Sequence, residues 1–242
     1  MMKKLYLFFF ILFSVLETNA QNVIKVSYHV LYRPTEQTVS PIENDYVLEL
    51  AGDSSFYTKV KDSLEIARRL DFGDTVFKDF ANQRVSFVGL VKSVKYYTTE
   101  PMPNFQWECL DGDTIFCGYP CSKARVQYRG RTWNVLYTLD LPYSDGPWKL
   151  CGLPGLIMKV VDQKRDFSFS AYKVETVKEL IGTFSKKGAK SVTPKEYAED
   201  LVSAYSYEDF SNSKVHIIVD GKEWKPTQKT PCLLEYFDEK IK

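Results

Sequence analysis

The sequence predicts a β-rich α+β domain, built on one large curved antiparallel sheet with at least two helices packed on it. Three observations lead to this fold class. Apolar and polar residues alternate with period two through much of the chain. Segments rich in glycine, aspartate or proline separate the alternating stretches, as turns between strands do. Aromatic residues make up 15% of the 242 residues, and many share the apolar side of a strand, which favours a half-barrel with an aromatic concave face.

Two strands and a helix are expected in the first third of the chain. Residues 46–50 alternate as a strand, and residues 59–70 change to a helical period, with Gly73 as a stop signal. His29 falls on the polar face of the preceding strand, where a solvated side chain is expected rather than a ligand. The apolar face of that strand holds Ile24, Val26, Tyr28, Val30 and Tyr32.

The middle of the chain predicts more strands. Residues 84–118 have strand-like composition, and prolines within 98–104 indicate a loop or a sheet edge. Residues 126–139 predict a hairpin that turns at Gly130 and has one aromatic face. A second hairpin is expected between 156–161 and 167–174, about a polar turn.

The end of the chain predicts a helix and a hairpin. Thr193 is the expected N-cap, Pro194 suits the first helical position, and Glu196 completes a capping box. Residues 215–219 read as a strand, and Asp220-Gly221 is a strong hairpin turn. No linker divides the chain, so residues 21–242 are expected to form a single domain.

The first twenty residues read as an export signal. Lys3 and Lys4 precede an apolar run over 5–16, and Thr18-Asn19-Ala20 is a suitable cleavage site. The run is shorter than the roughly 20 residues of a spanning helix. We therefore expect cleavage before Gln21, no transmembrane anchor afterwards, and a periplasmic location, with the extracellular space as the alternative.

The net charge of the exported chain narrows the class of partner. Removal of Lys3, Lys4 and Glu17 with the signal leaves 30 of the 32 basic and 30 of the 31 acidic residues, and so no net charge. Nucleic acids and anionic membranes select strongly basic partners. Neither is expected to bind this chain.

One stretch of motifs has a specific resemblance. The block 118–133 is followed by Gly146-Pro147-Trp148-Lys149 and then by Gly152-Leu153-Pro154-Gly155-Leu156-Ile157. These motifs resemble the GLPGLI family, exported proteins of Bacteroidetes-type bacteria whose function is undetermined. The matching positions before the hexapeptide are Gly118, Tyr119, Cys121, Lys123, Ala124, Gly130, Arg131, Trp133, Gly146, Pro147, Trp148 and Lys149.

The hexapeptide itself reads as a turn that leads into a strand. Pro154 suits position i+1 of a type II β-turn, and Gly155 supplies the positive φ needed at i+2. The strand that follows is apolar except for Lys159, which predicts burial on most of both faces.

The loop before the hexapeptide is a candidate binding site. Tyr143, Asp145, Trp148 and Lys149 could form a recognition loop on a rigid sheet. The alternative is a structural corner in which Trp148 fills the core.

A further hypothesis is that four aspartates near the hexapeptide supply paired carboxylates for acid/base chemistry, although aspartates with this spacing more commonly lie at polar hairpin ends. The candidates are Asp140, Asp145, Asp162 and Asp166.

The cysteines predict disulfides in an oxidising compartment. Cys121 is expected to pair with Cys117 or Cys151, Cys109 with Cys117 is a competing pair, and Cys232 is the candidate for a remaining thiol. A zinc site has only the Cys117-x3-Cys121 spacing in its favour, so no metal is expected. A nucleophilic Cys121 would need His29 or His216 as its base.

These observations favour a non-catalytic envelope protein that binds an apolar small molecule or another envelope protein, without a cofactor. The alternative is a hydrolase or a thiol or redox enzyme that uses Cys121 or the Asp145 loop. A concave apolar cavity would favour binding, and a buried carboxylate pair or a Cys–His contact would favour an enzyme.

Overall fold

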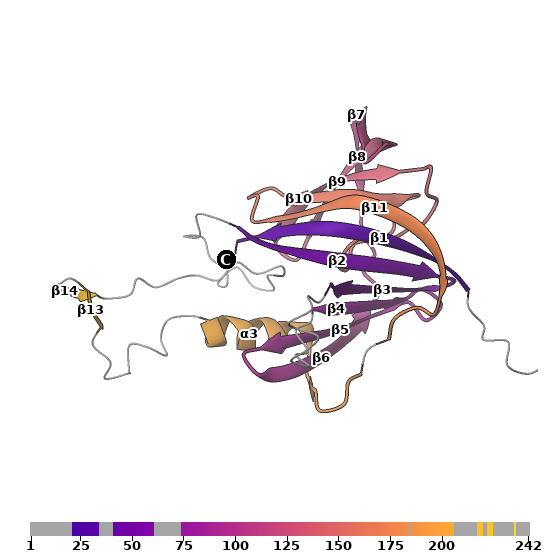
Figure 1. Ribbon diagram of the computed structural model, residues 1–242. Helices are drawn as coiled ribbons and strands as arrows, with labels where there is room; N and C mark the ends of the chain where they lie inside the picture. The colour runs from indigo at the N-terminus through magenta and orange to yellow at the C-terminus, as the bar shows by residue number, and fades with distance from the viewer. Residues whose placement is uncertain are drawn as a thin grey trace, which may run out of the picture.

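The fold is predominantly β. The computed structural model describes residues 21–33, 41–60, 74–183, 185–205, 217–219, 222–224 and 235. Twelve strands form one open sheet in the order β12-β6-β5-β4-β3-β2-β1-β11-β10-β9-β8-β7 (Figure 1). They are β1 (Gln21–Tyr32), β2 (Ile42–Ala51), β3 (Ser54–Lys59), β4 (Thr75–Asp79), β5 (Arg84–Val91), β6 (Val94–Pro101), β7 (Glu108–Phe116), β8 (Tyr119–Tyr128), β9 (Arg131–Thr138), β10 (Leu156–Asp162), β11 (Phe167–Glu179) and β12 (Lys190–Ser191).

Two meanders make up this sheet. Strands β1 to β6 follow one another in space as in sequence, and so do β7 to β11. The long antiparallel pairing of β1 with β11, from Gln21 opposite Glu179 to Tyr32 opposite Phe167, joins the meanders. Only β12 runs parallel to its neighbour, β6. The sheet is therefore mixed but mostly antiparallel.

The sheet bends so that its two halves face each other. Lys78 of β4 donates hydrogen bonds to the segment that follows β9, and Arg129 in the β8–β9 turn pairs with Glu100 of β6. These strands are several positions apart in the sheet order. In Figure 1, β7 to β11 lie above and β3 to β6 below, with β1 and β2 between them.

Period-two alternation is confirmed where the sequence is clearest. In β1, Val26, Tyr28 and Val30 are buried, whereas His29 on the other face pairs with the exposed Asp45. In β10 the residues on both faces are buried except for Lys159 and Val161, which are half-buried. The apolar residues of the bent sheet thus meet in one core, which contains Tyr57, Trp133 and Leu150 among others.

Both predicted central hairpins are present. β8 and β9 pair from Ser122 opposite Tyr137 to Tyr128 opposite Arg131. Arg129 and Gly130 in the turn both have positive φ, of 50° and 72°, as the two central residues of a type I′ turn require. β10 and β11 form the second hairpin. The expectation of a loop or sheet edge over 98–104 is confirmed. Residues 98–101 continue β6 beyond the short β12, which pairs only with Tyr96 and Tyr97, and residues 102–104 lie outside the strand.

One helix, α3 (Pro194–Tyr205), lies in the described part of the chain, at the end of the sheet that holds β5 and β6 (Figure 1). Thr193 accepts from the Glu196 amide at 3.2 Å, and the Glu196 carboxylate accepts from the Thr193 amide at 2.8 Å. The capping box is confirmed. Tyr197 packs edge-on against Phe87 and Tyr96.

The expectation of at least two helices is met only in part. Lys59, expected to begin a helix, instead ends β3, and residues 61–73 lie outside the described chain. The export signal, His216, Asp220-Gly221 and Cys232 also lie outside it. Near the end, β13 (Ile217–Val219) and β14 (Lys222–Trp224) pair as the predicted hairpin. No helix in the described chain is long and apolar enough to cross a membrane.

Candidate functional site

The loop between β9 and β10 enters the interior of the bent sheet. Three of the four residues predicted to bind a ligand are buried, with Asp145, Trp148 and Lys149 only 1%, 4% and 3% exposed. Tyr143, at 36%, reaches the surface. Trp148 lies 5.6 Å from Trp133 between ring centroids. The loop therefore fills the core, as a structural corner would.

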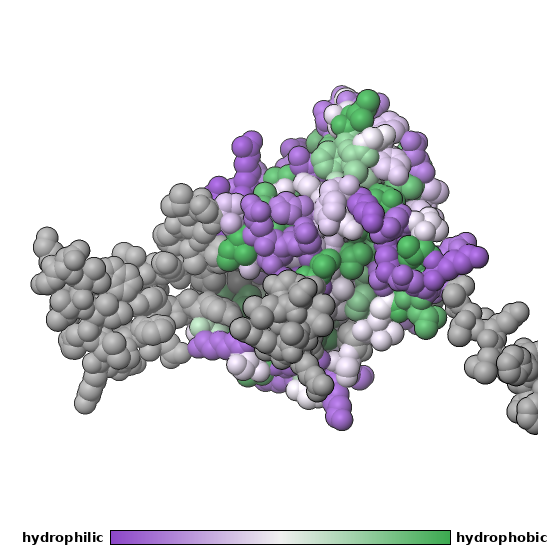
Figure 2. Space-filling view, in the orientation of Figure 1, coloured by the Kyte–Doolittle hydropathy of each residue, from purple (hydrophilic) through white to green (hydrophobic). Residues whose placement is uncertain are grey.

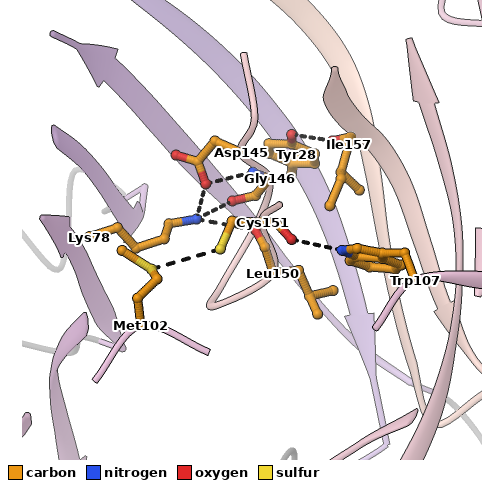
Figure 3. Close-up of polar contacts among 9 residues, drawn as sticks. All are labelled: Tyr28, Lys78, Met102, Trp107, Asp145, Gly146, Leu150, Cys151 and Ile157. Atoms are coloured by element: carbon orange, nitrogen blue, oxygen red, sulfur yellow. Dashed lines mark hydrogen bonds and ion pairs between the residues drawn. The ribbon is translucent and has the colours of Figure 1, made fainter. Parts of the chain in front are cut away.

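A lysine from the opposite wall of the sheet holds this loop. The Lys78 ammonium donates to Asp145 Oδ1, to the Gly146 carbonyl at 2.7 Å and to the Leu150 carbonyl at 3.4 Å (Figure 3). Lys78 is fully buried and Asp145 almost so. A buried charge is tolerated when it is paired and hydrogen-bonded. We call Lys78 and its three acceptors the lysine clamp.

The lysine clamp is connected to the hexapeptide by the main chain. The Ile157 amide donates to the Asp145 carbonyl at 2.9 Å, and the Tyr28 hydroxyl donates to the Ile157 carbonyl at 2.6 Å. Burial raises the pKa of Tyr28 well above its ordinary value, and the charge of Asp145 adds to the effect. Tyr28 is therefore a neutral donor that joins β1 to β10 within the core.

The predicted reason for Gly155 is wrong. Positive φ falls instead at Gly152, at 91°, and at Trp148, at 54°. Gly155 is required because its backbone passes β9: a Cβ at that position would lie 2.0 Å from the Thr138 carbonyl oxygen. At Gly155 the backbone of the hexapeptide thus packs directly against the end of β9, and Leu156 and Ile157 follow as buried residues of β10.

Cys151 is buried beside the lysine clamp and next to Met102 and Trp107. Its sulfur lies 3.8 Å from the Met102 sulfur, and its carbonyl accepts from Trp107 Nε1 at 2.9 Å (Figure 3). Burial raises the pKa of the Cys151 thiol to about 11. Cys151 is accordingly a protonated core residue at neutral pH.

The predicted disulfides among the described cysteines are also wrong, since Cys109, Cys117, Cys121 and Cys151 are free. The register of β7 and β8 explains part of this result. Cys109 lies opposite Ala124, and Cys121 lies opposite Thr114, so neither faces Cys117 or any other cysteine across this pair of strands. Cys109 and Cys117 are exposed, whereas Cys121 and Cys151 are buried. Burial raises the pKa of Cys121.

The predicted carboxylates are brought together only in part. Asp162 and Asp166 both pair with the buried Arg131, at 2.6 and 3.1 Å. Asp162 also accepts from the Phe167 amide, so it closes the β10–β11 turn. Asp145 belongs to the lysine clamp, and Asp140 is exposed. Each buried member of the set thus neutralises a buried cation.

Sequence reasoning missed the buried partners of three predicted site residues. Lys78 pairs with Asp145, Glu100 with Lys149, and Arg131 with Asp162. Each of the three charged residues points to the buried face of its strand, because the residue two positions away on that face is also buried. These neighbours are Val76 for Lys78, Thr98 for Glu100 and Trp133 for Arg131. A charged residue at a position that the apolar–polar alternation assigns to the buried face needs a buried partner. That signal was available in the sequence, although it does not identify the partner.

The structure also has an open groove of about 500 Å³ beside β8. Its lining is mainly polar, and Arg125 pairs with Glu108 there through both carboxylate oxygens. The lining residues are Gln106, Glu108, Arg125, Val126, Gln127, Thr132 and Gln163. In the described part of the chain, no three His, Cys, Asp or Glu residues are placed to hold a metal ion.

The class defined by these features is a β domain with one open, bent sheet and a buried ion-paired loop. Two crystal structures of PNGF-II, a peptide N-glycanase, have a similar fold, with TM-scores of 0.53 and 0.55 and identities of 14% and 16%. The similarity covers 77% of this chain but only 34% of PNGF-II. No family model and no curated protein matches the chain. These comparisons concern the fold alone.

Proposed function

We propose that this chain is an exported, non-catalytic binding domain that recognises another protein of the cell envelope. The predicted export signal and the resemblance of the motifs to the GLPGLI family support an exported location. The absence of net charge in the exported chain disfavours nucleic acid and anionic lipid as partners. A protein is the partner class that best fits the surface described next.

An exposed apolar row that runs from the end of β9 across β8 to the edge strand β7 carries the proposal. Ile115 is 79% exposed and lies opposite Pro120, and Leu139, 59% exposed, follows β9 at the same end of the sheet. We call Ile115, Pro120 and Leu139 the apolar row. Figure 2 shows a strongly hydrophobic group at the top of the molecule, over the position of β7. Clustered exposed apolar side chains commonly mark a protein-binding site.

The position of β7 supports the same proposal. β7 ends the sheet, so its outer backbone groups face away from β8. The three residues 111–113 interrupt the register between Leu110 and Thr114. Such a bulge, with Asp111 and Asp113, protects an edge against non-specific pairing. Residues 108–110 and 114–116, on either side of the bulge, keep a regular register with β8, and the second of these segments contains Ile115 and offers an edge that a partner strand could extend.

The interior is less suited to an apolar ligand. A half-barrel carrier needs an empty concave face, and here Trp148, Leu150 and Leu153 of the loop occupy the space between the walls. The thiol-enzyme alternative has less support: Cys121 is buried with a raised pKa, and His29 lies on the outward face of β1.

Site-specific photocrosslinking tests the proposal. A photoreactive phenylalanine analogue at position 139 should give one discrete protein adduct in the envelope of the native host. The same analogue at position 172, where Tyr172 is also 53% exposed on β11, serves as the matched control. The Ile115→Ser change should abolish the adduct without altering the midpoint of urea unfolding, because Ile115 is mostly exposed.

Two results would contradict the proposal. Identical adducts at positions 139 and 172 would show non-specific contact, and no adduct at position 139 would leave the apolar row without a partner. Mass spectrometry of the protein purified from its native envelope adds a separate check. A stoichiometric lipid in that sample would support the apolar-ligand hypothesis instead.

A further inference from the structure

The two carboxylate oxygens of Asp145 have very different surroundings. Oδ1 accepts from the Lys78 ammonium and, at 2.7 Å, from the Gly146 amide. Oδ2 is buried and has no hydrogen-bond partner in the described part of the chain, and Figure 3 shows it pointing away from Lys78. Buried side-chain oxygens normally have at least one partner. The ion pair between Lys78 and Asp145 therefore leaves an uncompensated cost at Oδ2.

The lysine clamp also has the features that favour a bond between its two side chains. The Lys78 side chain is fully buried and that of Asp145 is 1% exposed, so water is excluded. A lysine amine removed from water is activated as a nucleophile, and well-oriented reacting groups reach effective concentrations of about 10⁵–10⁸ M. The Gly146 amide donates to Oδ1, where negative charge develops when an amine attacks the carboxyl carbon. The carbonyls of Gly146 and Leu150 accept from the Lys78 nitrogen and so orient it.

We propose that Lys78 and Asp145 condense to an intramolecular amide, an isopeptide bond between β4 and the loop that follows β9. A proton first passes from the ammonium to Oδ2. The amine then attacks Cγ of Asp145, and the Gly146 amide stabilises the negative charge on Oδ1. A second proton passes from the nitrogen to the Oδ2 hydroxyl, which leaves as water while the double bond to Oδ1 forms again. One C–N bond forms and one C–O bond breaks, so no oxidant or other reactant is required.

The product suits this site better than the ion pair does. A neutral amide replaces two buried charges, and Oδ2, the oxygen without a partner, is the atom that leaves. The remaining N–H donates to the Gly146 carbonyl, 2.7 Å from the Lys78 nitrogen, and Oδ1 keeps the Gly146 amide. Replacing a buried ion pair by a neutral group of similar volume is often neutral or stabilising. The dry interior therefore favours condensation and the expulsion of one water molecule.

The bond joins the two halves of the bent sheet covalently. Lys78 lies in β4 of one half, and Asp145, 67 residues further along the chain, lies between β9 and β10 of the other. A cross-link over this separation stabilises a protein mainly by restricting its unfolded chain, as a disulfide does. The described cysteines are free. The isopeptide bond thus supplies a covalent link that these cysteines do not.

Mass spectrometry of the purified chain, denatured and reduced, tests this inference. The intact mass should be lower by one water molecule than the mass calculated from the sequence with the same N-terminus. Trypsin should fail to cleave after Lys78 and should release one branched peptide, in which residues 70–84 are joined to residues 132–149. Fragmentation of this peptide should locate the bond between Lys78 and Asp145.

Two variants are the controls. Lys78→Met removes the nucleophile and should have its full calculated mass. Lys25→Met should still lose one water molecule, because Lys25 pairs with Glu49 and Glu179 nearer the surface, at 21% exposure of its side chain. The peptide map of the unmodified chain is decisive even if Lys78→Met does not fold. The full calculated mass for the unmodified chain, or a cross-link at any other lysine, would overturn the proposal.

Discussion

Gly155 lies so close to Thr138 that no side chain fits between the two strands. A Cβ on residue 155 would be 2.0 Å from the Thr138 carbonyl oxygen and 2.7 Å from its carbonyl carbon. Both are backbone atoms of the end of β9, so neither can move as a flexible side chain could. This close contact between Gly155 and Thr138 lies where the loop ends and β10 begins.

The first prediction compares two glycines of the hexapeptide. Gly155→Ala should lower the free energy of unfolding by about 3 kcal/mol or more, since an overpacked site must shift the backbone. Gly152→Ala is the matched control, because its Cβ would meet nothing closer than Trp107 Nε1 at 3.6 Å. Its cost should be about 1–2 kcal/mol, from the positive φ alone. Urea unfolding measures both, and equal losses would refute the steric explanation.

The second prediction concerns the lysine clamp. Lys78→Met leaves Asp145 buried without its cation and should cost about 3–5 kcal/mol. The double change with Asp145→Asn should cost less than the sum of the single changes, because neither charge is then left unpaired. A double-mutant cycle by urea unfolding measures the coupling. Additive losses would mean that Lys78 and Asp145 stabilise the fold independently.

The third prediction concerns thiol reactivity. In a Cys232→Ser background, Ellman's reagent should modify Cys109 and Cys117 in the native protein, because both are exposed, and Cys121 and Cys151 only after denaturation. Denatured, unreduced protein should therefore titrate with four thiols. A total of two would reveal a disulfide, contrary to the free cysteines of the structure.

The fourth prediction is the pH dependence of stability due to Cys151. The pKa of its thiol is raised from 9.0 to about 11 by burial, so the unfolded chain loses this proton first as the pH rises. The stabilisation is complete below about pH 9 and is lost between about pH 9 and 11, by roughly 3 kcal/mol in total. Subtracting the curve of Cys151→Ala isolates this effect from those of the buried tyrosines. Parallel curves for the two proteins would contradict it.

The fifth prediction concerns the start of α3. Thr193→Ala removes the N-cap acceptor for the Glu196 amide and should cost about 1 kcal/mol. Thr193→Ser keeps that acceptor and is the matched control. Because α3 packs on β5 and β6 through Tyr197, amide hydrogen exchange should rise first in the helix. Equal exchange in both variants would show that the cap contributes little.

Local patterns determined a large part of the fold. The alternation in β1, the turn at Gly130 and the capping box at Thr193 depend on residues adjacent in sequence, so their physical causes can be read directly. The same holds for the burial of β10 on both faces. These features predicted a mostly antiparallel β domain and its main hairpins without any knowledge of long-range contacts.

Tertiary structure alone decided how the charged residues are used. Lys78 meets Asp145, Glu100 meets Lys149, and Arg131 meets Asp162 only after the sheet bends and the loop enters its interior. The reason for Gly155 is likewise a contact with a distant strand rather than a local turn. The free state of Cys109 and Cys121 follows in part from the register of β7 and β8, which no spacing of residues specifies. Such contacts depend on which strands become neighbours, and that is settled by the burial of the whole core.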